Sequence, residues 1–164
     1  MPRSSKLSRI MQEELPSLSY QRRMLYRTTP KEVLSLFKLI NREIFNGKLP
    51  VPKIEVMSNC RDYWGFCVGD DFVDPTESKS NCVLRVSDKW FCKQWLVVIL
   101  AHEMCHQYQW DVYSKKRLRK GLEPILSHGP SFFHYKDKLA RFGIPLKKMH
   151  NHDLWLMYQD FFKC

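Results

Sequence analysis

Two histidines and a glutamate lie close together in one short segment, His102-Glu103-Met104-Cys105-His106. Histidines four residues apart project from the same face of a helix, about one turn from each other, so both imidazoles can reach one metal ion. Tetrahedral Zn²⁺ accepts imidazole nitrogens at about 2.0–2.1 Å. Glu103 follows the first histidine and can accept a proton from a water activated by the metal. The spacing therefore predicts zinc-dependent hydrolysis of a peptide bond, with Glu103 as the catalytic residue.

A catalytic zinc site needs a third protein ligand and one open position. His128 lies in the segment Ser127-His128-Gly129-Pro130, immediately before a predicted helix. The positive N-terminal end of a helix disfavours protonation of a nearby imidazole and keeps it neutral for ligation. We therefore predict that His102, His106 and His128 hold the metal.

Other side chains are weaker candidates. Glu123 is the remaining rival ligand, whereas His134 shares a predicted helix face with charged residues and is expected to be solvated. His150 and His152 form an H-x-H pair that could bind a metal, but a surface role before the last helix is the better interpretation. No motif in the sequence identifies the side chain that would stabilise the oxyanion. Tyr113 and His134 are the two candidates for this role.

The predicted elements alternate between helical and strand-like periodicity. A helix starts at Thr28-Thr29-Pro30 and runs to about Phe45, with apolar residues at three- and four-residue spacing. Short β-prone runs between Val51 and Ser87 predict three strands, and the last run, 82–87, is expected to be an edge strand that aligns an extended substrate. The helix with the two histidines is predicted from residue 88 or 89 to about Tyr113. A third helix follows Gly129-Pro130.

These elements predict an α+β fold in which helices pack on a small, mainly antiparallel sheet, with a zincin-like active-site helix. A chain of 164 residues fits one such domain. We expect residues 1–27 to form a basic arm or a short marginal helix, and residues 28–164 to form the domain. Its core is expected at about 33–142, with a C-terminal helix at about 153–162.

The formal net charge of +10 favours a polyanionic partner through counterion release. A basic loop is predicted between the second and third ligands, where it could contact DNA phosphates; a plain solvated loop is the alternative. Its basic residues are Lys115, Lys116, Arg117, Arg119 and Lys120. The sequence lacks an apolar secretory region and a long apolar run, which predicts a nuclear or cytoplasmic, intracellular protein. The six cysteines are accordingly expected to be reduced thiols.

The order of these motifs resembles the SprT-like metallopeptidase domain, the family that includes the Spartan-type DNA–protein crosslink proteases. The resemblance covers about residues 33–142. It implies the same three zinc ligands, Glu103 as the catalytic residue, and substrate proteins that are bound or crosslinked to DNA, with single-stranded or disrupted DNA as an activator. The segments that carry it are Phe45-Asn46-Gly47-Lys48-Leu49-Pro50, Trp64-Gly65-Phe66-Cys67, His102-Glu103-Met104-Cys105-His106 and His128-Gly129-Pro130-Ser131-Phe132.

Two other functions remain open on the sequence alone. The chain could be a non-catalytic nucleic-acid-binding or transcription-associated module that keeps zinc for structure. It could also be a zinc hydrolase that acts on a non-peptide substrate. Replacing Glu103 by Gln separates the first of these from a peptidase, because only a peptidase has an activity to lose.

Overall fold

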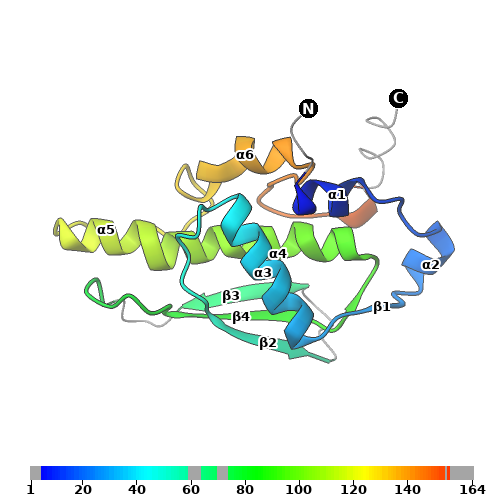
Figure 1. Ribbon diagram of the computed structural model, residues 1–164. Helices are drawn as coiled ribbons and strands as arrows, with labels where there is room; N and C mark the ends of the chain where they lie inside the picture. The colour runs from blue at the N-terminus through cyan, green and yellow to red at the C-terminus, as the bar shows by residue number, and fades with distance from the viewer. Residues whose placement is uncertain (1–4, 59–63, 70–73, 154, 156–164) are drawn as a thin grey trace.

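The computed structural model describes residues 5–58, 64–69, 74–153 and 155 (Figure 1). A three-stranded sheet forms one layer, and helices α3 (Pro30–Glu43) and α4 (Lys93–Tyr108) lie across one face of it. Helices α1 (Lys6–Gln12) and α6 (Lys136–Arg141) lie on the side of α4 away from the sheet. The α+β class predicted from the sequence is confirmed. Most of the predicted C-terminal helix, 153–162, lies outside the described residues, as do Cys60 and Cys164.

Helix α3 begins and ends where its local sequence predicts. The hydroxyl of Thr29 accepts a hydrogen bond from the main-chain N–H of Glu32 at 3.2 Å, and Pro30 occupies the first turn, where its missing N–H is not needed. Asn46 and Gly47 have φ of 54° and 73°, so the chain leaves the helical conformation and turns toward the sheet. The buried stripe of the helix consists of Val33, Leu36, Phe37, Leu39 and Ile40.

The sheet contains the three predicted strands in the order β2-β4-β3. They are β2 (Lys53–Met57), β3 (Gly65–Gly69) and β4 (Cys82–Ser87). Strand β4 pairs parallel with β2 and antiparallel with β3. A separate antiparallel ribbon joins β1 (Tyr26–Arg27) to β5 (Lys89–Trp90). Two of the three strand pairings in the described part of the chain are therefore antiparallel, as expected.

The prediction that residues 82–87 form an edge strand was wrong. Strand β4 is hydrogen-bonded on both sides, so its main chain is not available to a substrate. Strands β2 and β3 precede β4 in the sequence, but β4 lies between them in the sheet. No local pattern in the sequence reveals this order. Among the described strands of this sheet, β2 and β3 are the edges, and β3 is the edge that packs closely on α4.

A continuous helical segment runs from Lys93 to Arg119 through α4, the π-helical turn η1 (Gln109–Tyr113) and α5 (Ser114–Arg119). It starts later than predicted because β5 occupies residues 89 and 90. It also ends later, so the basic loop predicted at 114–121 is helical as far as Arg119. Lys, Arg and Leu are strong helix formers, so the composition that indicated a solvated loop also suits a helix.

The N-terminal segment, expected to be an arm or a marginal helix, packs on the core. Ser5 caps α1 by accepting from the N–H of Ser8, and Ser17 caps α2 (Leu18–Arg22) in the same way. The side chain of Gln94 in α4 donates to the carbonyl of Glu13 at 3.2 Å. Buried residues of α1 join the same hydrophobic core as α3 and α4: Leu7, Ile10 and Met11.

None of the helices within the described residues has both the length and the apolar composition that crossing a bilayer requires.

Candidate metal centre

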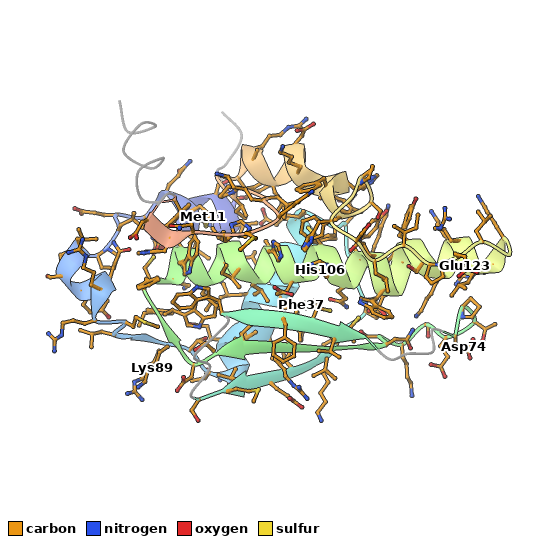
Figure 2. The ribbon with its side chains drawn as sticks, turned by 180° about the vertical axis from the view of Figure 1, so that it is seen from behind. Met11, Phe37, Asp74, Lys89, His106 and Glu123 are labelled. Carbon is orange, nitrogen blue, oxygen red and sulfur yellow. The ribbon has the colours of Figure 1, made fainter. Side chains whose placement is uncertain are left out.

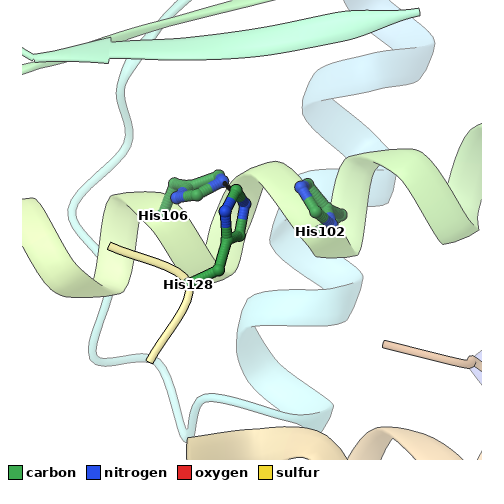
Figure 3. Close-up of side chains that lie close together, drawn as sticks. All are labelled: His102, His106 and His128. Atoms are coloured by element: carbon green, nitrogen blue, oxygen red, sulfur yellow. Dashed lines mark hydrogen bonds between the residues drawn. The ribbon is translucent and has the colours of Figure 1, made fainter. Parts of the chain in front are cut away.

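Helix α4 carries His102 and His106 one turn apart, and their ring centroids are 5.1 Å apart. His128 comes from the segment between α5 and the 3₁₀ turn η2 (Phe132–Tyr135), and its Nε2 atom lies 3.0 Å from Nε2 of His106. The three side chains gather on one side of α4 (Figure 3). One nitrogen from each ring lies within 4.8 Å of the others. The structure therefore brings together the three histidines that the sequence indicates.

The cluster could hold a metal ion, and its donor set fits zinc. Ligands bound tetrahedrally at 2.0–2.1 Å are separated from one another by about 3.3 Å. The observed separations, 3.0 Å for one pair and at most 4.8 Å overall, approach this value, so small side-chain adjustments would complete the geometry. Three imidazoles leave one of four tetrahedral positions for water or substrate, which is the pattern of catalytic rather than structural zinc.

The surroundings of helix α4 favour the neutral forms of His102 and His106. Burial lowers the pKa of His102 to about 3, and the neighbouring rings of His150, His106 and His128 act in the same direction. Burial also lowers the pKa of His106 to about 4, with a further contribution from His128. A metal binds the neutral imidazole, so these shifts remove proton competition for the ligand nitrogens near neutral pH.

Glu103 is buried beside the cluster, with 7% of its surface exposed. Its Oε1 atom lies 3.9 Å from Nε2 of His102. Burial raises the pKa of its carboxyl to about 8, although a hydrogen bond from the main chain of Cys67 in β3 acts in the opposite direction. A cation among the three histidines would favour the ionised carboxylate. Proton affinity in this range suits a group that must both accept and release a proton.

The family model described as SprT-like matches residues 33–150, which include all of these site residues. The chain belongs to the SprT-like family. This confirms the resemblance seen in the motifs and extends the matched region a few residues beyond the predicted core. No curated protein sequence matches the chain.

Within the described part of this SprT-like chain, the cysteines have free thiols: Cys67, Cys82, Cys92 and Cys105. Cys105 lies between the two histidines of α4 and is fully buried. Burial raises the pKa of its thiol well above the usual range. Its sulfur is not among the ligand atoms that gather at the cluster, so Cys105 is not a candidate ligand.

The rival ligands lie elsewhere. His134 is exposed, as predicted, and its ring stacks on Tyr108 at a centroid distance of 5.4 Å. Glu123 is exposed beyond α5, where its main-chain carbonyl accepts from Arg117. Tyr113, a candidate oxyanion donor, lies in η1 with its ring near Tyr108 and Arg117. Within the described residues, the metal-binding cluster contains only the three predicted histidines.

The surface role predicted for the H-x-H pair was wrong. His150 lies beside the SprT-like site, with its ring centroid 5.0 Å from that of His102, and its Nε2 atom is buried. His152 is 9% exposed, stacks on Phe91 at 3.7 Å, and its Nε2 lies 3.1 Å from Oε1 of Gln21. The segment that follows α6 folds back over the first turns of α4, where both rings contact Trp95. Trp95 is distant in the sequence, so this burial depends on a tertiary contact.

The burial of His152 predicts an acid-sensitive fold. Burial lowers the pKa of His152 to about 4, whereas the unfolded chain binds this proton near pH 6.5. The stability that the neutral ring contributes is therefore present above about pH 6.5 and is lost as the pH falls toward about 4. The variant His152→Phe retains a ring against Phe91 but has no group to protonate. Over this pH window, we expect its free energy of unfolding to fall by on the order of 1–2 kcal/mol less than that of the wild type. Urea unfolding of both metal-free proteins at several pH values measures this difference. The same dependence of the unfolding free energy on pH in the two proteins would contradict the prediction.

The basic residues of α5 differ in what they can bind. Lys115 is 3% exposed, and its ammonium donates to the carbonyls of Glu77 and Lys79 at 2.9 Å each. It therefore fixes the loop before β4 to the helix and is not free to contact a phosphate, contrary to its prediction as a DNA ligand. Lys116, Arg119 and Lys120 are exposed, although Arg119 also donates to a carbonyl at Pro75.

Proposed function

We propose that this SprT-like protein is a zinc-dependent metalloendopeptidase. The observation that carries the proposal is the convergence of His102, His106 and His128 beside the buried carboxyl of Glu103. These are the ligands and the acid–base group that hydrolysis of a peptide bond at a zinc site requires. Family membership supports the proposal independently of the geometry.

Each residue has a chemical role that follows from its position. A zinc ion held by the three imidazoles would supply Lewis acidity toward the scissile carbonyl and the attacking water. Glu103 would accept the proton of that water on its carboxylate and return it to the leaving amine. The hydrogen bond from Cys67 holds the carboxyl in place between the two events. Burial of the site limits competing water and strengthens the electrostatic interactions within it.

Strand β3 is the proposed docking strand for the substrate and replaces residues 82–87 in that role. It is an edge strand of its sheet, and the main chain of Cys67 reaches the carboxyl of Glu103. An extended peptide that paired with this edge would bring its own carbonyls close to the catalytic residue. Main-chain pairing is largely independent of sequence, so this arrangement suits a peptidase with broad substrate choice.

We further propose that the substrates are proteins bound or crosslinked to DNA. The net charge of +10 supports a polyanionic partner. The experiment that tests the function incubates the zinc-loaded protein with a DNA-binding protein, with and without single-stranded DNA, next to the Glu103→Gln variant. We expect cleavage by the wild type only, and more of it when DNA is present. Zinc and DNA binding without cleavage would instead support a non-catalytic module.

The proposed DNA contact predicts a specific effect of two exposed lysines, Lys116 in α5 and Lys120 directly after it. Replacing Lys116 and Lys120 by Glu should weaken binding to single-stranded DNA and flatten its dependence on salt. If each lysine contacts one phosphate, the slope of log K against log salt falls by about 1.4. Fluorescence anisotropy of a labelled oligonucleotide at several salt concentrations measures this.

Lys31→Glu combined with Lys89→Glu is the matched control, because it changes the net charge equally at exposed positions. Lys89 lies at the opposite end of the molecule from Glu123, which follows α5 (Figure 2). Equal losses of affinity in the two double variants would mean that net charge alone drives binding, and would remove α5 as the contact.

A further inference from the structure

Gln109 connects the two segments that carry the metal-binding histidines. It is the first residue of the π-helical turn η1, and its side chain is fully buried, with 0% exposed. Its Oε1 atom lies 3.3 Å from Nδ1 of His106. Its Nε2 atom donates to the carbonyl of Ser127 at 2.7 Å and to the hydroxyl of Ser131 at 2.9 Å. One amide therefore contacts a ligand on α4 and both flanks of His128.

The contact with Ser127 fixes which way the amide of Gln109 points. A main-chain carbonyl can only accept, so the nitrogen of the amide must face Ser127, and the oxygen must face His106. An amide oxygen can only accept, so Nδ1 of His106 must carry the proton. The remaining ring nitrogen, Nε2, then carries a lone pair that is directed toward His128 and the cluster. This is the tautomer that metal ligation by Nε2 requires.

The same amide also fixes the segment of the third ligand. Ser127 and Ser131 lie on either side of His128, in a turn closed by a hydrogen bond from Gly129 N to the carbonyl of Ser127 at 2.8 Å. This turn belongs to no long helix or strand, so side-chain contacts such as those of Gln109 help to determine the approach of His128. A π-helical turn next to a functional site is a recurrent device for placing a side chain that a regular helix would point elsewhere.

We propose that Gln109 is a positioning residue that sets the tautomer of His106 and holds the turn of His128 in register with it. The inference rests on the proposed function only in assuming that the cluster binds zinc. Partners of this kind orient metal ligands, and their loss lowers metal affinity by about 10–100-fold.

The test compares Gln109→Leu with Gln107→Leu. Gln107 is also 0% exposed on the same helical segment, but its amide bonds to Pro50 and Asp111 instead of the histidines. Zinc affinity is measured by competition with a chromophoric chelator, and the tautomers are read from ¹⁵N NMR of the histidine rings in the metal-free proteins. We expect Gln109→Leu to lose affinity about 10–100-fold and to show both tautomers of His106. Gln107→Leu should retain the wild-type affinity and the single Nδ1–H tautomer.

Gln109→Glu keeps an acceptor toward His106 and should therefore restore the Nδ1–H tautomer, even if the Leu variant does not fold. Loss of that tautomer in Gln109→Glu, or its persistence in Gln109→Leu together with wild-type zinc affinity, would overturn the inference. Equal loss of zinc in the two Leu variants would also overturn it, since buried packing alone would then explain the effect. A wild type that binds no zinc would defeat the proposed function, while the tautomer measurement would still decide the role of Gln109.

Discussion

Glu103→Gln should reduce protein cleavage by about 10²- to 10⁴-fold, the usual contribution of a positioned general base, while zinc remains bound. Glutamine has the shape of glutamate but cannot take up the proton of the attacking water. Its carbonyl oxygen can still accept the hydrogen bond that Cys67 now gives to Glu103. The three histidines are unchanged, so the metal site stays intact. Cleavage rates and zinc content of the two purified proteins measure the two halves of this expectation.

Glu123→Gln is the matched control, because Glu123 is an exposed glutamate in the segment between the second and third histidines. We expect it to change neither cleavage nor zinc content. Cleavage by Glu103→Gln at the wild-type rate would remove Glu103 as the base. Loss of zinc together with activity would assign Glu103 to metal retention instead.

The elements around the site were predictable where short-range periodicity determines them. Helix α3 follows from its cap at Thr29 and an apolar stripe that includes Phe37 and Ile40, both fully buried in the structure. The spacing of His102 and His106 is also local, because any regular helix places them on one face. The prediction of His128 as the third ligand used its position before a predicted helix, and the structure brings its ring to the other two.

The features that the sequence did not reveal depend on contacts between distant segments. Strand β4 became central because β2 and β3 pair on either side of it, which its own residues do not indicate. The basic composition of residues 114–121 indicated a solvated loop. It did not reveal that Lys115 donates hydrogen bonds to two carbonyls of a loop more than thirty residues earlier. The side chains of His152 and Gln21 share a hydrogen bond, although the two residues are separated by most of the sequence. Local patterns therefore predicted the elements, and tertiary packing decided their order and their buried polar contacts.

The ionisable side chains of the site are buried in α4, and their protonation states make this burial possible. Two histidines and a glutamate in an otherwise apolar helix would be costly to bury in their charged forms. Burial lowers the pKa of His102 and raises the pKa of Glu103, so both side chains favour their neutral forms at this position. A bound cation reverses the preference of Glu103 alone, since the histidines ligate as neutral rings. Metal binding would thus ionise Glu103 without changing the protonation of the histidines.

His128→Ala should lower zinc affinity by roughly 10²- to 10³-fold and abolish measurable cleavage, because apparent zinc binding free energies of about 10–16 kcal/mol are shared among a few ligands. His102 and His106 would remain on the rigid α4 but could supply only two of the three protein ligands that a catalytic site needs. Chelator competition measures the affinity. The fold should be retained, because His128 is half-buried in a turn rather than in the core.

His134→Ala is the control for this variant, since His134 is an exposed histidine six residues later, in η2, and stacks on Tyr108 away from the cluster. It should bind zinc and cleave as the wild type does. If His128→Ala kept wild-type affinity, another donor would have to complete the site. His150 is the residue to test next, because its ring already lies 5.0 Å from that of His102. A normal affinity in the double variant as well would mean that the metal does not bind at this cluster.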